Sequence, residues 1–161
     1  MSVKVIDRGW NRIKKQLKEA DNAYTKVGVL QKAGNYNAED GGKTIAQVAT
    51  QNEFGSKDGK IPSRPFMRKS YDLNKQSINK LKKKLYDNVL SGKYSMKKAL
   101  GLLGEAHKGQ IQTTILKSSL FKDNAPMTKA IKRKKGRSKG AIKPLIDTGM
   151  MREKISYEVK I

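Results

Sequence analysis

Basic side chains are the most abundant chemically active groups in this sequence. From Lys129 to Lys143 the chain carries eight basic residues and no acid, namely Lys129, Lys132, Arg133, Lys134, Lys135, Arg137, Lys139 and Lys143. Such a run can neutralise phosphates without reading sequence, because it contains no aromatic residue that would stack on bases. It can equally dock on an acidic protein surface, so the pattern leaves both kinds of partner open.

Residues suited to catalysis or metal binding are sparse by comparison. The chain has one histidine, His107, and no cysteine, and its 14 carboxylates are scattered without the spacing of a metal site. Catalysis needs convergent groups, typically a nucleophile, a base and a group that orients the base. We therefore expect no enzyme, no metal site and no cofactor, and we interpret His107 as a structural residue.

The overall charge agrees with the basic run. The 161 residues include 36 Lys and Arg against 14 Asp and Glu, a formal net charge of +22. A charge of this size favours polyanions or acidic protein surfaces as neighbours. The length predicts a single domain over residues 1–161. No apolar run approaches the roughly 20 residues of a membrane span, so we expect no membrane partner.

Hydrophobic periodicity predicts helices over residues 3–20 and 45–54. In the first helix, apolar residues recur at intervals of three and four, which puts Trp10 on a face that packs against a sheet or another subunit. Trp10 is the expected anchor of that contact. In the second helix, Thr44 is a suitable N-cap and Gly55 is a usual C-terminal signal.

Two longer helices are predicted in the middle of the chain, over residues 66–90 and 96–116. Both repeat apolar residues at helical spacing, and the polar face of the first is strongly cationic. Glycine inside a helix costs up to about 1 kcal/mol relative to alanine. We therefore expect another backbone to approach the second helix closely at its internal glycines, Gly101, Gly104 and Gly109.

Two strands complete the predicted fold. Valines alternate with other residues over residues 25–30, and residues 155–161 alternate almost perfectly between apolar and polar side chains. We expect these strands to pair. The predicted class is α+β, with a small, mainly antiparallel sheet, packed helices that include the two long ones, and a basic, flexible loop over residues 119–143. Within that loop, residues 124–128 predict a turn into a short helix.

Two stiff, turn-rich stretches bracket the middle of the chain. The first runs from Asn52-Glu53-Phe54-Gly55 into residues 61–68, which contain two prolines, and the second covers residues 144–149. Proline fixes its own φ and biases the preceding residue towards extended backbone. We interpret these stretches as architectural or interface positions, together with Trp10: Phe54, Gly55, Pro62, Arg64, Pro65, Phe66, Asp147, Thr148 and Gly149.

The order of these motifs resembles the tail-completion or neck proteins of tailed bacteriophages, the virion-morphogenesis and minor-capsid group that includes tail terminators. The resemblance covers roughly residues 25–160. Each motif is short, and their order and spacing carry the likeness: Val27-Gly28-Val29-Leu30, a helix leading into Asn52-Glu53-Phe54-Gly55, residues 61–68, Asn124-Ala125-Pro126, residues 144–149 and the final strand. The two long helices and the lysine-rich stretch over 129–143 depart from the pattern.

The resemblance implies a structural protein that works by assembly. Such proteins are small α+β domains that form a ring, commonly hexameric, on the last ring of the tail tube and join the tail to the head connector. The implied partners are further copies of the chain, the tail tube protein, connector or head-completion proteins, and passing DNA without sequence specificity. The implied location is the virion neck, assembled in the host cytoplasm.

Two alternatives remain beside the tail terminator. One is a basic protein that binds nucleic acid without sequence preference, for example a chromosomal or ribosome-associated factor. The other is a head-completion or adaptor protein of the same neck, which differs in its ring partner. Salt-dependent DNA binding by a monomer or dimer would favour the first alternative. Ring formation or attachment to tail tubes would favour a neck protein.

Overall fold

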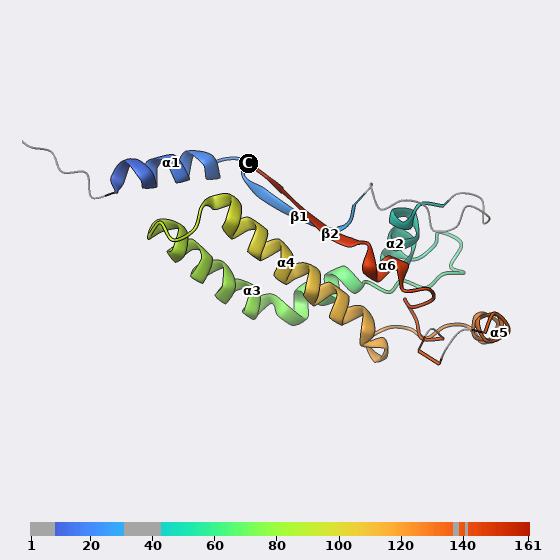
Figure 1. Ribbon diagram of the computed structural model, residues 1–161. Helices are drawn as coiled ribbons and strands as arrows, with labels where there is room; N and C mark the ends of the chain where they lie inside the picture. Colours follow the sequence, from blue (N-terminus) through green and yellow to red (C-terminus); the bar gives the residue numbers. More distant parts are fainter. Residues whose placement is uncertain (1–8, 31–42, 137–138, 141) are drawn as a thin grey trace, which may run out of the picture.

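The chain folds as an elongated α+β structure (Figure 1), which confirms the predicted class. The computed structural model describes residues 9–30, 43–136, 139–140 and 142–161. Its elements are, in chain order, α1 (Trp10–Ala20), β1 (Tyr24–Val29), α2 (Ile45–Phe54), α3 (Phe66–Leu90), α4 (Met96–Leu116), the 3-10 turn η2 (Ser118–Leu120), α5 (Pro126–Lys134), α6 (Met150–Glu153) and β2 (Ile155–Lys160).

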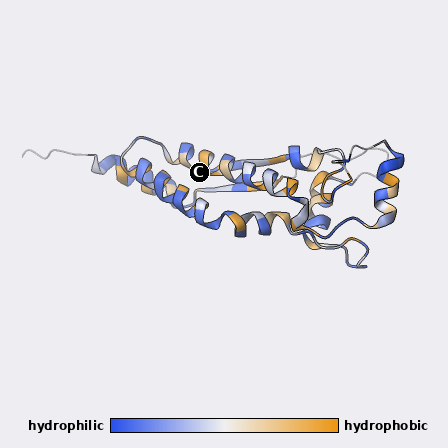
Figure 2. Ribbon diagram, turned by 90° about the horizontal axis from the view of Figure 1, so that it is seen from below, coloured by the Kyte–Doolittle hydropathy of each residue, from blue (hydrophilic) through white to orange (hydrophobic). Residues whose placement is uncertain are grey.

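Helices α3 and α4 form the long axis of the molecule and lie side by side (Figure 1). The second begins at a cap, because the Ser95 side chain accepts a hydrogen bond from the Lys98 N–H at 3.2 Å. Leu85, Val89 and Ala99 form a small buried cluster near the turn between the helices. In Figure 2, hydrophilic and hydrophobic residues alternate along these helices, as expected of helices with one buried face.

Strands β1 and β2 pair as an antiparallel sheet, as predicted. The register runs from Tyr24 opposite Lys160 to Val29 opposite Ile155. An isolated pair of strands is marginally stable in water and needs a packed partner. Helix α4 supplies that partner, because it contacts both strands along their length.

Gly104 allows α4 to lie close to the sheet. A Cβ atom at this position would lie 2.5 Å from Cδ2 of Tyr157 and 2.9 Å from Oγ1 of Thr25. The expected close approach therefore exists at Gly104, although side chains rather than backbone make it. The same expectation is wrong at Gly101 and Gly109, where a Cβ would meet nothing within 4 Å.

We expect a Gly104→Ala substitution to lower the free energy of unfolding by about 1–3 kcal/mol, because the methyl group would press the helix away from Tyr157. Gly101→Ala and Gly109→Ala are matched controls on the same helix. Each should raise stability by up to about 1 kcal/mol, since alanine is the better helix former and the space is open. Urea unfolding followed by circular dichroism measures all three. A Gly104→Ala variant as stable as the controls would show that the sheet does not need this close approach.

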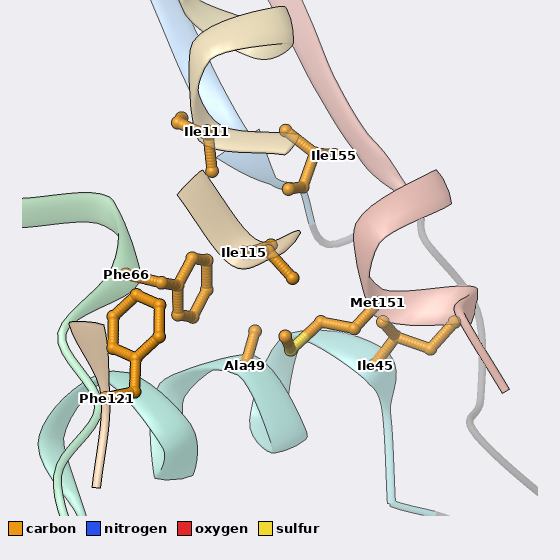
Figure 3. Close-up of a cluster of buried hydrophobic side chains, with 8 residues drawn as sticks. All are labelled: Ile45, Ala49, Phe66, Ile111, Ile115, Phe121, Met151 and Ile155. Atoms are coloured by element: carbon orange, nitrogen blue, oxygen red, sulfur yellow. The ribbon is translucent and has the colours of Figure 1, made fainter. Parts of the chain in front are cut away.

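The main hydrophobic core lies at one end of the long helices (Figure 3). It gathers residues from α2, α3, α4, α6, β2 and the segment after η2: Ile45, Ala49, Phe66, Ile111, Ile115, Phe121, Met151 and Ile155. Phe66, predicted as an architectural residue, is fully buried here. The core thus fixes the start of α3 against the end of α4, beside the short helices α2 and α6.

Helix α1 differs from its prediction. It begins at Trp10 after Gly9, and residues 3–8 of the predicted helix lie outside the described part of the chain. Trp10 is 62% exposed in the described part of the chain, and its predicted role as an anchor stays a prediction. The helix is held instead by Arg12, which donates to the Leu90 carbonyl at 3.2 Å, and by Gln16, which accepts from the Met96 N–H at 2.9 Å.

The stretch predicted as a basic loop contains a helix. Residues 126–134 form α5, with Pro126 in its first turn, so the prediction of a loop is wrong there and the predicted turn into a short helix is right. Residues 137–138 and 141 of that stretch lie outside the described residues. Helix α5 buries none of its residues and projects at the opposite end of the molecule from α1 (Figure 1).

Candidate functional site

The buried carboxylate of Glu53 caps the first turn of α3. The N-cap position of α3 is Pro65, which has no side chain to accept the first N–H groups. Glu53, at 5% exposure near the end of α2, accepts from the N–H of Met67 at 2.9 Å and of Arg68 at 3.3 Å. The Arg68 Nε also donates to it at 3.1 Å. A negative group at this place satisfies donors that no carbonyl can reach and suits the helix dipole.

The proline-containing stretch between α2 and α3 is bound back onto α2. The Arg64 N–H donates to the Asn52 carbonyl at 2.7 Å, and the Ser63 hydroxyl donates to the Glu53 carbonyl at 2.8 Å. Gly55 ends α2 at a φ of 83°, and a Cβ there would lie 3.0 Å from the Ile61 carbonyl oxygen. Glycine is therefore required at this turn by both its backbone conformation and its space.

Arg64 joins this stretch to the chain beyond α4. Its side chain is buried at 6% exposure. Nε donates to the Lys122 carbonyl at 2.7 Å, and Nη2 donates to the Asp123 carbonyl at 3.2 Å and to Oδ1 of Asn124 at 3.1 Å. Burial lowers the pKa of Arg64 from its ordinary value, while the charge of Asp123 acts in the opposite direction. The guanidinium therefore holds the turn that leads into α5.

Two further residues extend these contacts to the second turn-rich stretch. Asn124 Nδ2 donates to the Ile142 carbonyl at 2.7 Å, and Lys132 Nζ donates to the Ile146 carbonyl at 2.5 Å. We call Glu53, Arg64, Asn124 and Lys132 the polar node. The polar node ties together stretches that lie up to about 90 residues apart, and these include four of the motifs that carry the resemblance, but not the two strands.

Residues 147–149 lead the chain from the polar node into α6 and β2. Gly149 adopts a φ of 85° before α6, and the Thr148 hydroxyl oxygen accepts from the Met150 N–H at 3.4 Å. Asp147 lies beside this turn, half-buried. The three predicted residues therefore lie together at the entry of α6, with Gly149 rather than Asp147 or Thr148 at the N-cap position.

The remaining predicted architectural residues are spread around the polar node. Pro62 and Pro65 flank Arg64 and are half-buried. Phe54 is 66% exposed, and its ring centroid lies 5.1 Å from the guanidinium carbon of Arg68. The Arg68 cation lies over the ring, and Phe54 is largely exposed to solvent instead of filling the core.

A cleft of about 400 Å³ is lined by residues of α5, of the segment 118–123 around η2 and of the segment after α5 that includes Lys139 and residues 142–144. We call it the basic cleft, and its lining residues are Ser118, Ser119, Phe121, Asp123, Lys129, Arg133, Lys139, Ile142, Lys143 and Pro144. Asp123 is the acid among them and is paired with Lys129. Hydrogen bonds from Lys129 and from the Asn124 N–H lower the pKa of Asp123 below its ordinary value.

The structure divides the eight predicted basic contact residues into groups. Lys132 bonds backbone in the polar node, and Lys134 and Lys135 are exposed but do not line the cleft. Arg137 lies outside the described residues. The cleft receives the other four: Lys129, Arg133, Lys139 and Lys143.

No family model, curated protein or solved structure matches this chain. The function must therefore be argued from its own residues. Over the described residues, no helix is long and apolar enough to cross a membrane. The same residues contain no cluster of three or more histidine or acidic side chains that could hold a metal ion.

His107 lies away from the polar node and the basic cleft. It borders a cavity of about 150 Å³ beside Tyr71, whose ring meets the imidazole edge-on at 6.5 Å between centroids. Its Nε2 is buried without a hydrogen-bond partner in the described part of the chain. Burial, and then the charge of Lys82, lower the pKa of His107 below its ordinary value. The neutral ring is therefore favoured at this place.

Glu53, Asn124 and the structural role of Lys132 were missed by sequence reasoning. For Glu53 a signal existed, because it follows Ile45 and Ala49 at steps of four and so falls on the buried face of α2. An acid on an apolar stripe, shortly before a helix that starts at proline, indicates a cap for that helix. For Asn124 and Lys132 no periodic signal exists, because their partners are backbone carbonyls in irregular segments.

Proposed function

We propose that this chain is a structural subunit in the neck of a tailed bacteriophage, a tail terminator or tail-completion protein. It forms a ring with further copies, a hexamer by the resemblance, that caps the tail tube and joins the tail to the head connector. The protein acts through assembly, without catalysis or a cofactor.

The observation that carries the proposal is the polar node. Four of the short motifs that resemble neck proteins are brought together in space: Glu53 and Arg64 join residues 52–55, 61–68 and 124–126, and Lys132 on α5 reaches Ile146 within residues 144–149. A likeness made of scattered fragments would have no reason to converge. Their convergence supports a shared architecture in which this node positions the surrounding helices.

The two ends of the molecule supply surfaces for assembly. Helices α1 and α5 lie at opposite ends (Figure 1), and neither buries a residue. Their large apolar side chains remain exposed, namely Trp10 and Leu17 on α1 and Met127 and Ile131 on α5. A subunit with a different exposed apolar surface at each end suits head-to-tail contacts between subunits. Such contacts close into rings when the rotation between subunits allows it.

The apolar face of α5 provides a test in the virion. We expect a phage that lacks this protein to produce abnormally long or unjoined tails in negative-stain electron microscopy, and the wild-type gene supplied in trans to restore normal virions. An Ile131→Asp variant should fail to restore them, because it places a charge on the apolar face. Thr128→Asp, the same charge change at an exposed position one residue from Met127, is the control.

Normal virions without the protein would overturn the proposal. The appearance of defective tails separates the two neck roles, because uncontrolled length indicates a missing terminator and normal length without heads indicates a missing adaptor. Equal rescue by Ile131→Asp and Thr128→Asp would remove the apolar face of α5 from the assembly contact.

The basic cleft favours a second candidate function, sequence-independent binding of nucleic acid by a monomer or dimer. Purified protein that binds DNA with a steep salt dependence and forms no ring would support this candidate over the neck role.

A further inference from the structure

Among the described residues, the basic cleft holds more cations than acids. Asp123 is paired with Lys129. Within the described part of the chain, no ion pair involves the other three cations, Arg133, Lys139 and Lys143. Like charges that face one cleft repel each other, and an anion between them relieves that repulsion.

The walls of the cleft are fixed by the polar node. Arg64 holds the wall at residues 122–124, and Asn124 and Lys132 hold the wall at residues 142–146. Ser118 and Ser119 also line the cleft. Hydroxyls, lysines and arginine are the side chains that most often contact phosphate oxygens in nucleic-acid complexes.

Helix α5 separates its basic contacts from its apolar ones. Lys129 and Arg133 are four residues apart, as are Met127 and Ile131, and the two pairs are offset by two residues. At 3.6 residues per turn this offset places the pairs on nearly opposite sides of the helix. The basic side faces the cleft, so the apolar side is left for a different contact.

The lining of the cleft fits a nucleic-acid backbone better than exposed bases. Its aromatic residue, Phe121, is buried in the core and presents no stacking platform of the kind that single-stranded binders use. Four of its ten lining residues are cations and one is an acid, which favours an anionic partner. We propose that the basic cleft binds the phosphate backbone of duplex DNA through Arg133, Lys139 and Lys143. The choice of DNA rests on the function proposed above.

A charge-matched pair of variants tests this inference. The cleft variant carries Arg133→Gln, Lys139→Gln and Lys143→Gln. The control carries Lys80→Gln, Lys83→Gln and Lys84→Gln, three exposed positions on α3. Both lose the same charge, so any difference reports position and not net charge. The probe is a fluorescein-labelled duplex of about 20 base pairs, titrated by fluorescence anisotropy over a range of salt concentrations.

We expect the cleft variant to lose up to about 2.7 from the slope of log K against log salt, at about 0.9 for each phosphate contact. At physiological salt this corresponds to a rise in Kd of roughly 100-fold, against less than about threefold for the control. Asp123→Asn should change binding in the opposite direction, because it releases Lys129 and steepens the slope by about 1. Thermal unfolding checks that each variant is folded.

Equal weakening by the cleft and control variants would overturn the inference, because binding would then follow net charge alone. Polyglutamate that binds as tightly as the duplex, with the same loss in the cleft variant, would overturn the assignment to DNA. The virion experiment stays separate. Defective tails together with unchanged DNA affinity in the cleft variant would remove this inference alone, and normal virions would remove the neck role alone.

Discussion

An Arg64→Ala variant is expected to lose about 3 kcal/mol of unfolding free energy. The guanidinium makes three hydrogen bonds from a buried position, and bonds to a charged group contribute about 1.5–3 kcal/mol each before rehydration of the exposed partners. The loss should concentrate beyond α4, because Arg64 is the link to residues 122–124. Urea unfolding gives the magnitude, and hydrogen exchange at the amides of α5 gives the location.

Two further substitutions define what Arg64 does. Arg64→Lys keeps the charge but cannot bond three acceptors with a planar fork, so it should recover less than half of the loss. Arg12→Ala is the matched control, since Arg12 is exposed and, among the described residues, donates one hydrogen bond, to the Leu90 carbonyl. Its loss should stay below about 1 kcal/mol. Full stability of Arg64→Ala, with α5 amides protected as in the wild type, would show that the core alone holds this region.

A Glu53→Ala variant is expected to lose about 2–3 kcal/mol. The substitution leaves the N–H groups of Met67 and Arg68 without their acceptor and removes the ion-pair partner of Arg68. A capping residue alone contributes about 1 kcal/mol, and burial of the unsatisfied donors adds the rest. Urea unfolding measures the loss, and faster hydrogen exchange at these two amides locates it in the first turn of α3.

The control for Glu53 is another glutamate that pairs with a cation on the surface. Glu105 forms an ion pair with Lys108 within α4 and is exposed, so Glu105→Ala should cost less than about 0.5 kcal/mol. Glu53→Gln keeps the shape and one acceptor oxygen without the charge, and should fall between the two. If Glu53→Ala cost no more than Glu105→Ala, water would be able to replace the carboxylate at the start of α3.

The helices could be predicted from sequence wherever a local signal marks their ends. The bounds of α3 and α4 agree with the prediction because proline precedes the first and Ser95 caps the second. The error at α5 has a physical cause. Its nine residues contain three lysines and one arginine, and its apolar side has only Met127 and Ile131, too short a stripe to predict a helix. The structure leaves this helix without a buried residue.

The polar node could not be predicted because its contacts are not periodic. The acceptors of Arg64 lie 58 to 60 residues further along the chain, and two of them are backbone carbonyls that any residue type would supply. The eight basic residues could be found in the sequence, but which of them line the cleft could not. Whether a lysine faces the cleft or donates to a carbonyl, as Lys132 does to Ile146, depends on how α5 is rotated against residues 142–146.

The pairing of β1 with β2 sets an order of events during synthesis. Thr25 bonds Glu158 across 133 residues, so β1 leaves the ribosome long before its partner strand exists. The hairpin of α3 and α4 is built from neighbouring segments and can form earlier, since local contacts require less loop closure. Docking of β2 against β1 and α4 is then the last step. A chain interrupted before β2 would keep an open strand edge, so synthesis of β2 decides when the sheet can form.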